Sequence, residues 1–302
     1  MFPYTVTVRT SNERAALVAL LMRPHAKWQL VADDVEEAGS SVEVLFGRGH
    51  GQQALLGSTA GFEEELTAAS ATIARWEHEG LSVLTLLDES YPAQLLTVHQ
   101  RPPILMYRGS LQVSDAQGVA IVGTRHPSPD GVKRAYDLGR ALSTQSVPVI
   151  SGLAAGIDTA ALRGSLAGQG RTVAVIGTGL YHCYPKENAE LQAQIASEGA
   201  VISQFLPDSP PTKWSFPMRN AVMSGYAMAT VVVEAAWRSG ARMQARLALE
   251  HGRAVFLLDS LLEHDWARDY SKRPGVTVVA ELDDLMSGLE RMKPRTGQLV
   301  WG

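Results

Sequence analysis

The chain has 302 residues, 45% of them hydrophobic, and a formal net charge of −4, so it can bury a sizeable core and its total charge does not mark a nucleic-acid binder. The single cysteine, Cys183, excludes an internal disulfide and a cysteine-based zinc site. Because no apolar run reaches the ~18 residues of a membrane span and the first residues lack a signal-peptide pattern, we expect a soluble cytoplasmic protein.

The first quarter of the chain is predicted to be helical. Apolar residues recur at helical spacing within residues 11–78, most clearly in the amphipathic stretch from Phe62 to Trp76. The intervening segment Gly47–Gly57 is rich in glycine and is predicted to be a loop. We therefore predict a small helical N-terminal domain over residues 1–80.

From Leu81 onward the pattern changes to alternating apolar strands and helices. The predicted strands are Val83–Leu86, Val119–Val122, Val147–Ile150, Val173–Ile176, Val201–Ser203, Thr230–Glu234, Ala254–Leu257 and Val276–Val279. The predicted helices are Gly131–Ser143, Thr159–Ala167, Ala189–Ser197, Arg219–Ala227, Ala241–His251 and Asp283–Met292. Strands that are apolar throughout are expected where helices cover both faces of a parallel sheet. Residues 81–302 are thus predicted to form an α/β domain with an extended Rossmann-like, doubly wound, mostly parallel sheet, which binds ligands at the carboxyl ends of its strands.

The most informative motif is Ser151-Gly152-Leu153-Ala154-Ala155-Gly156-Ile157-Asp158, directly after a predicted strand. A strand that breaks into small residues and then opens a helix presents backbone N–H groups to an anion, and Asp158 in the first helical turn suits the helix dipole. Tight strand-to-helix packing is the alternative interpretation. Because Gly123-Thr124-Arg125 repeats the pattern after another predicted strand, the two loops predict one shared phosphate site.

The later loops at the same edge of the predicted sheet also carry small, polar or cationic residues. These are Gly177, Gly179, Lys213, Phe216, Arg219, Asn220, Glu234, Ser239 and Gly240. Arginine and lysine side chains there can bind phosphate oxygens. Phe216 and Trp214 alternate with these cations, which is typical of single-stranded nucleic-acid binding, although both rings could instead be core packing under a loop.

The sequence gives little support for a catalytic site or a cofactor site. Glu234 is interpreted as a structural anchor rather than a general base. His126, His182 and His251 lack partners at metal-ligand spacing, so no metal site is predicted. The first loop is Gly-Thr-Arg rather than G-x-G-x-x-G, so no dinucleotide cofactor is expected.

Residues 88–257 resemble the DprA/Smf family of bacterial DNA-processing proteins. The matching segments are Asp88–Pro92, Arg101–Leu105 with Gly109, Ile121–Arg125, Ser151–Asp158, Ala174–Leu180, Tyr184-Pro185, Phe216–Asn220, and Glu234 with Ser239-Gly240. The resemblance implies a homodimer that binds single-stranded DNA, helps to load the recombinase RecA onto it and serves natural transformation. It places phosphates at Gly123, Thr124, Arg125, Ser151, Gly152, Ala154 and Gly156, the DNA backbone at Lys213, Arg219 and Asn220, and a base near Phe216. Structural or ligand-contacting roles fall to Asp158, Gly177, Gly179, Glu234, Ser239 and Gly240.

The sequence also departs from the family pattern. Ala221 stands where the family has a second arginine, and Gln204 and Gln244 replace a common glutamate and threonine. Leu258-Asp259 replaces Pro-Gly, and from the chain's length we expect no winged-helix domain of the kind many members append. We expect a diverged member whose DNA binding is weakened by about 1–3 kcal/mol for the lost cation. The sequence itself does not establish a dimer, although an exposed apolar helix such as Met243–Leu249 could supply the contact.

The residues themselves are also compatible with a second function. The same superfamily of Smf/LOG-like folds includes phosphoribohydrolases, but their Pro-Gly-Gly-x-Gly-Thr-x-x-Glu loop is replaced here by Glu234-Ala235-Ala236-Trp237-Arg238-Ser239-Gly240, which disfavours hydrolysis. Binding of a free nucleotide as a signal, for example in defence against foreign DNA, is the alternative to DNA binding.

Overall fold

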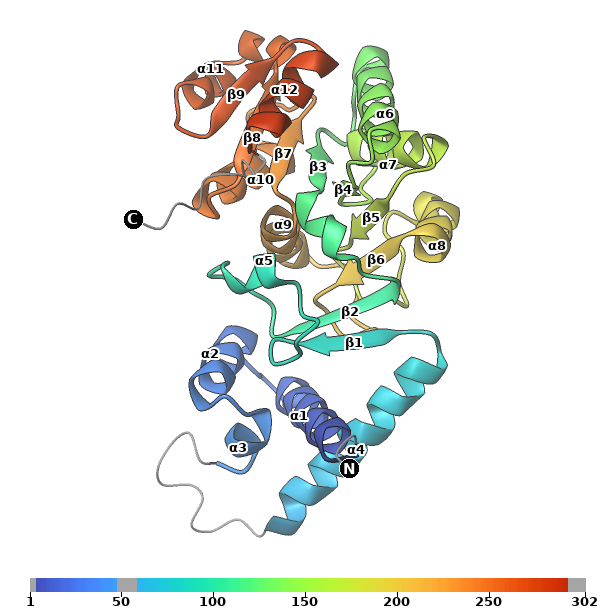
Figure 1. Cartoon of the computed structure of the whole chain (residues 1–302), viewed down its shortest axis with the longest axis vertical. Coiled ribbons are helices and arrows are strands. Elements are labelled where there is room, and N and C mark those ends of the chain that lie inside the picture. Colours follow the sequence, from blue (N-terminus) through green and yellow to red (C-terminus); the bar gives the residue numbers. More distant parts are fainter. Residues whose placement is uncertain (1–3, 48–58, 293–302) are drawn as a thin grey trace, which may run out of the picture.

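The computed structural model describes residues 4–47 and 59–292 of the protein. In this part of the chain a nine-stranded sheet carries helices on both faces, and four N-terminal helices lie at one end of the sheet (Figure 1). No helix among the described residues is long and apolar enough to cross a membrane.

The N-terminal helices are α1 (Tyr4–Met22), α2 (Trp28–Ala38), α3 (Ser41–Leu45) and α4 (Thr59–His78), in agreement with the predicted helical region. Apart from Gly47, the predicted loop Gly47–Gly57 lies outside the described residues. Glu13 on α1 accepts hydrogen bonds from the Ser40 hydroxyl (2.7 Å) and the Ser41 amide (2.6 Å), which fixes the start of α3. Arg14 forms an ion pair with the buried Asp88 (2.7 Å), which ties α1 to the turn after the first strand.

The strands are β1 (Ser82–Thr85), β2 (Ile104–Gly109), β3 (Val119–Val122), β4 (Val149–Ser151), β5 (Thr172–Val175), β6 (Ala200–Ser203), β7 (Ala229–Val232), β8 (Ala254–Leu258) and β9 (Val276–Val279). Their order is β1-β2-β6-β5-β4-β3-β7-β8-β9. Strands β3 to β9 are parallel, whereas β1 and β2 form an antiparallel edge. The predicted doubly wound, mostly parallel sheet is confirmed. Strand β2 was missed because it follows two prolines and its second half contains Arg108 and Gly109.

Two apolar clusters flank the parallel strands and explain why these strands contain almost no polar residues. Val119 and Ile121 of β3 pack with α6 (Pro129–Thr144), α7 (Ile157–Ala167) and α12 (Leu282–Met292). Ala120 and Val122 point to the opposite face, where α8 (Ala189–Glu198), α9 (Ser215–Tyr226), α10 (Gly240–Glu250) and α11 (Asp265–Ser271) contribute to the larger cluster. That cluster continues through the short helix α5 (Ala93–Leu96) into α1 to α4.

Two local predictions need correction. Helix α9 begins at Ser215, four residues before the predicted start at Arg219, because Thr212 and Ser215 exchange hydrogen bonds (both 3.1 Å) that cap the first turn. Phe216 therefore projects from a helix rather than from the loop before it, whereas Arg219 and Asn220 lie on α9 within the predicted helix. The segment 243–249 lies within α10 and does not form an exposed apolar face, since Ala245, Leu247 and Ala248 are buried against the sheet; it cannot supply the predicted dimer contact as it stands.

Candidate functional site

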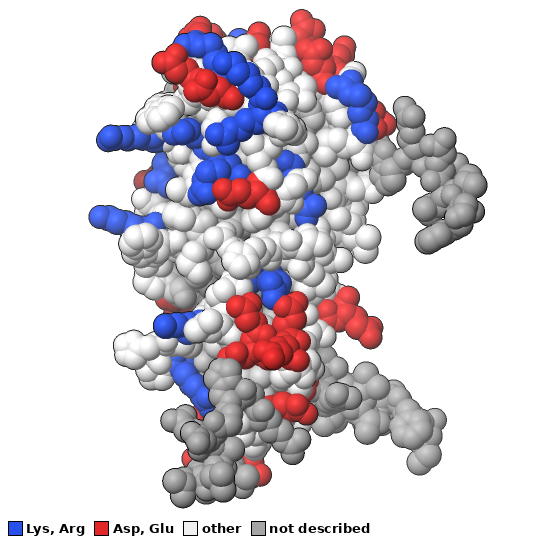
Figure 2. Space-filling model, turned by 90° about the vertical axis from the view of Figure 1, so that its left-hand side faces the viewer, with Lys and Arg blue, Asp and Glu red and all other residues white. Residues whose placement is uncertain are grey.

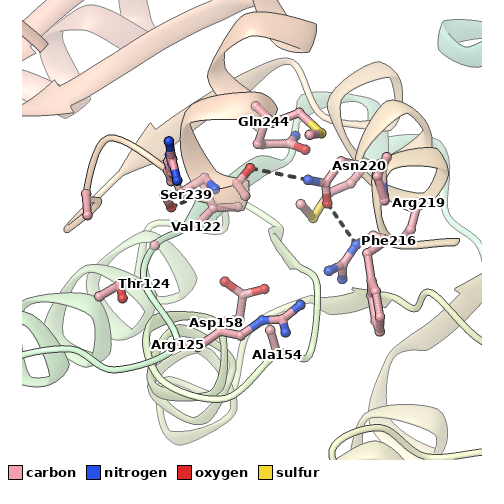
Figure 3. A pocket seen from close by; sticks show the side chains of 18 of the residues that line it. Val122, Thr124, Arg125, Ala154, Asp158, Phe216, Arg219, Asn220, Ser239 and Gln244 are labelled. Carbon is pink, nitrogen blue, oxygen red and sulfur yellow. Dashed lines mark hydrogen bonds between the residues drawn. The ribbon is translucent and has the colours of Figure 1, made fainter. Parts of the chain in front are cut away.

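The chain direction across the sheet reverses between β3 and β7, and a cavity of about 380 Å³ lies at this position. From β3 to β6 each new strand is added on one side, and the chain then crosses back to place β7 against the other side of β3. Such a switch point separates the loops that follow the two strands and leaves a crevice at their carboxyl ends. The cavity wall comes from the loop after β3 and from α7, α9 and α10 (Figure 3).

A second cavity of about 240 Å³ adjoins the first and shares Arg125, Ala154, Phe216 and Arg219 with it. We call the two cavities together the furrow. Its wall residues are Val122–His126, Gly152, Ala154, Ala155, Asp158, Gly177, Tyr184, Pro185, Phe216, Pro217, Arg219, Asn220, Met223, Ala236, Arg238–Ala241, Met243 and Gln244. Among these described residues three are arginines and one is acidic, so the furrow is electropositive.

Arg125 and Phe216 meet in the furrow, where Arg125 is exposed and Phe216 is half-buried. The Arg125 guanidinium lies 5.2 Å from the centroid of the Phe216 ring, within the range of a cation–π contact. The Phe216 ring is half-buried and meets Tyr184 with centroids 5.4 Å apart and planes tilted by 45°. Figure 3 shows the Arg125 and Arg219 side chains reaching toward the middle of the cavity from different walls. An aromatic face next to a solvent-exposed cation suits a nucleotide, whose base can stack on the ring while its phosphate contacts the cation.

The backbone amides expected to hold phosphate are instead bound by Asp158. Its buried carboxylate accepts hydrogen bonds from the amides of Gly152 (3.1 Å), Gly123 and Ala154. Burial raises the pKa of this carboxyl, while the charge of Arg219 and the three amide bonds oppose the rise. A carboxylate in the first helical turn thus takes the place of the predicted external anion, and the two loops bind one another through it.

Arg219 is also buried, at 5% exposure, and its guanidinium serves the fold. It donates to the carbonyl oxygens of Gly152 and Val175 (the latter at 2.9 Å) and to the Asn220 side chain (3.0 Å). A Cβ atom at position 152 would overlap the guanidinium, so this approach requires glycine. Burial lowers the pKa of Arg219, and the nearby Asp158 opposes that shift.

A chain of polar contacts joins α9 to α10 behind the furrow. The Asn220 side chain donates to the carbonyl of Gly240 (3.3 Å). The fully buried Gln244 amide is oriented so that it donates to the Asn220 carbonyl (3.0 Å) and accepts from the Ser224 amide (3.2 Å). The Ser224 hydroxyl in turn contacts His251 Nδ1 (2.8 Å). Gln244 therefore bridges the two helices through its side-chain amide.

Five predicted site residues do not line the furrow. Ser151 is fully buried and donates to the Ile121 carbonyl (2.6 Å), while Gly179 packs under the backbone at Leu206 and Pro207. Gly156 begins α7 with φ of +83° against the loop after β3. Lys213 is exposed ahead of α9, and Glu234 accepts hydrogen bonds from the Ser128 amide (3.1 Å) and hydroxyl (2.8 Å) at the start of α6.

The remaining predicted residues meet at the furrow. They are Gly123, Thr124, Arg125, Gly152, Ala154, Asp158, Gly177, Phe216, Arg219, Asn220, Ser239 and Gly240. The exposed neighbour Trp214, at 79% exposure, is not core packing.

The sequence analysis missed Arg238, which is exposed and lines the furrow. Its position between Glu234 and Ser239, in a loop at the edge of the sheet that carries the site, was the signal in the sequence that could have identified it. Ala221, by contrast, is buried and lines a separate cavity of about 400 Å³ together with Gln204. The substitution at 221 therefore removes no cation from the furrow, and the expected weakening of DNA binding on that ground is not supported.

Comparison with known sequences gives a consistent assignment. A family model described as DNA recombination-mediator protein A matches residues 82–289. Protein Smf of Synechocystis sp. is 41% identical over 179 residues, which cover 58% of this chain and 45% of that protein. The chain thus spans less than half the length of that relative.

Two solved structures share the fold. The X-ray structure of DNA processing protein A from Streptococcus pneumoniae matches with a TM-score of 0.69 and 28% identity, over 95% of this chain and 98% of that one. The DNA processing protein A of Helicobacter pylori, described for its single-stranded DNA binding mode, matches with a TM-score of 0.63 and 25% identity, over 70% of this chain and 96% of that one.

Proposed function

The chain belongs to the DNA recombination-mediator protein A family, and we propose on this premise that it binds single-stranded DNA in the furrow as a DNA-processing protein without a catalytic step. Its Helicobacter pylori relative is described as binding single-stranded DNA, and that likeness includes the α/β fold that builds the furrow. The single observation that carries the proposal is the exposed Arg125 guanidinium over the Phe216 ring at the switch point of the sheet.

The chemistry of the furrow favours single-stranded over double-stranded nucleic acid as the ligand. Phe216 can stack only on a base whose face is free, and unstacked bases are a property of single strands. Arg125 and Arg238 are exposed and can neutralise phosphates, whereas the acidic wall residue Asp158 is already bonded to three amides. The furrow therefore offers exposed cations and an aromatic face within one cavity.

The proposal is tested by fluorescence anisotropy with a labelled oligothymidylate at two or more salt concentrations. Arg125→Gln should weaken binding and reduce the salt slope by ~0.7, the value for one single-strand phosphate contact. Phe216→Ala should weaken binding by about 1–3 kcal/mol with an unchanged slope, because stacking releases no counterions. Arg163→Gln, an exposed arginine on α7 that lines neither cavity, is the matched control. Wild-type affinity in both furrow variants would overturn the proposal.

A nucleotide sensor is the second candidate, and the size of the larger cavity favours it. About 380 Å³ falls within the range of small-molecule sites, so the cavity can accept one nucleotide. Competition with unlabelled mononucleotides in the same assay separates the two functions. Displacement of the oligonucleotide by equimolar mononucleotide, or binding of the mononucleotide alone, would favour the sensor.

The family assignment suggests three finer roles. We propose that the protein is a cytoplasmic homodimer that helps to load RecA onto single strands entering the cell during natural transformation. Analytical ultracentrifugation across a range of protein concentrations tests the dimer, and a monomer throughout would reject it. RecA-dependent ATP hydrolysis on strands coated with a single-strand binding protein tests loading, which is rejected if adding the protein does not shorten the lag.

A further inference from the structure

A second group of arginine and aromatic side chains lies beside the furrow, on the exposed side of α10. Its members are Trp237, Arg238, Arg242, Tyr270 and Arg273, and we call it the arginine strip. Together with Arg246 the first four line a cavity of about 480 Å³ that shares Arg238, Ser239, Gly240 and Met243 with the furrow. Figure 2 shows many Lys and Arg side chains, with some Asp and Glu among them, on the upper part of this face, and a group of acidic side chains lower down, toward the N-terminal helices.

The aromatic rings hold the arginines in place. The Arg242 guanidinium lies 3.8 Å from the Trp237 ring centroid and 5.8 Å from that of Tyr270. Arg273 lies 4.1 Å from the centroid of Tyr270, whose ring is buried at 3% exposure. Arg242 also donates to the Trp237 carbonyl (3.3 Å). Guanidinium groups stacked on rings lose less side-chain freedom when they bind a ligand, so these cations are pre-organised.

The charge of the strip is not neutralised within the described part of the chain. There Arg238, Arg242 and Arg273 form no ion pair with a carboxylate, whereas neighbouring cations do: Arg246 pairs with Glu250 (2.7 Å) and Lys272 with Asp269 (3.8 Å). The Arg242 Nε atom is buried and has no hydrogen-bond partner. Three unneutralised arginines on adjoining elements indicate a polyanionic ligand.

Trp237 narrows the class of polyanion. Its side chain is 56% exposed, so one face of the indole is open while Arg242 covers part of the ring. A nucleic-acid single strand presents both phosphates for the arginines and free bases for the indole, whereas a duplex hides its bases and an acidic peptide has no aromatic base to stack. The strip therefore matches the same ligand chemistry as the furrow.

We propose that a single strand bound in the furrow continues over the N-terminal turns of α10 and along the arginine strip, so that the strip extends the binding site for longer strands. This inference rests on the proposed function of the furrow. Arg238 belongs to both sites and marks the junction. Ser239 is the N-cap of α10, and Arg242 follows three residues later, ~4.5 Å along the helix axis, so a strand leaving the furrow at Ser239 meets the strip within its next nucleotides.

The test compares oligothymidylates of increasing length by anisotropy with the full chain. For wild-type protein the affinity should rise with length beyond what the furrow alone holds. Trp237→Ala and Arg242→Gln should each lower affinity for the longest strand about tenfold, the loss of one stacked base or charge-assisted contact, and leave the shortest bound strand unaffected. Arg125→Gln should weaken strands of every length. Arg163→Gln again controls for the loss of one positive charge.

The outcomes separate the two proposals. If Trp237→Ala and Arg242→Gln bind long strands as tightly as wild type, the strip is not part of the site, although the furrow stands. If both variants weaken short and long strands equally while their circular dichroism is unchanged, the strip does not act as an extension. If duplex DNA of the same length competes as well as the single strand, the base-stacking role of Trp237 is wrong. If wild type binds no oligonucleotide, the proposed function itself fails.

Discussion

Arg125 and Arg219 line the same furrow, yet the structure predicts opposite consequences for their removal. Arg219→Met would leave the Gly152 and Val175 carbonyls without their donor and the buried Asp158 carboxylate without its nearby cation. At about 1–3 kcal/mol for each of the two orphaned carbonyls, the variant should lose roughly 2–6 kcal/mol of unfolding free energy. Arg125→Gln removes an exposed side chain and one cation–π contact, worth about 0.5–1 kcal/mol.

Urea unfolding followed by tryptophan fluorescence measures both effects. Arg219→Met should unfold at clearly lower urea than wild type, whereas Arg125→Gln should change DNA affinity and hardly move the transition. Repeating Arg219→Met in an Asp158→Asn background isolates the electrostatic part, because the neutral side chain no longer needs the cation, and the loss should shrink. Equal stability of Arg219→Met and wild type would refute the structural role, and Arg219 would then return to the list of DNA-binding candidates.

Three further changes test the surroundings of the furrow. Gly152→Ala should destabilise the protein because its Cβ overlaps the Arg219 guanidinium, and thermal unfolding at an unchanged midpoint would contradict that packing. Ser239→Ala removes the hydroxyl that accepts from the Ala241 amide (3.1 Å) and should cost ~1 kcal/mol in urea unfolding; no loss would mean that this cap is dispensable. Burial lowers the pKa of His251 below its ordinary 6.5, so the unfolded chain takes up this proton first and stability falls as pH drops below that value. The stability advantage of wild type over His251→Asn should therefore narrow between pH 7 and pH 5, and a constant difference would contradict the shift.

The arrangement of the sheet could be predicted because its strands are apolar on both faces. Ile121 and Val122 each contact a different layer of helices, and that requirement appears in the sequence as an unbroken apolar run. The antiparallel strand β2 could not be found in this way, since only its first half is fully buried and its second half includes Arg108. The division of the chain at residue 80 stays a prediction, because the larger core cluster runs from α1 into the sheet.

The sequence predicts the positions of the loops better than it predicts the directions of their side chains. Arg125, Phe216 and Gly152 meet as expected, since parallel strands bring their carboxyl ends to one edge. Ser151 did not, because one residue of strand register decides whether a hydroxyl faces the furrow or the neighbouring strand. Arg238 and Trp237 could not be identified from the sequence for a related reason. Their neighbours Arg242 and Tyr270 lie on α10 and α11, and only the folded structure brings these side chains together.

Asp158 explains why a loop whose amides could bind an anion lies at a site that is lined by arginines. The amides of Gly123, Gly152 and Ala154 converge on one point, and a bound phosphate there would have to displace a carboxylate that the chain itself supplies. Since an internal carboxylate is present at far higher effective concentration than a ligand in solution, we expect the amides to fix the loop geometry rather than to bind a phosphate. We therefore expect recognition to depend on side-chain cations that form no ion pair among the described residues, and the candidates along this edge include Arg125, Arg238 and the arginines held on Trp237 and Tyr270. Binding along this surface should consequently depend on salt through side-chain cations, and substitutions that preserve the loop but remove those cations should abolish the dependence.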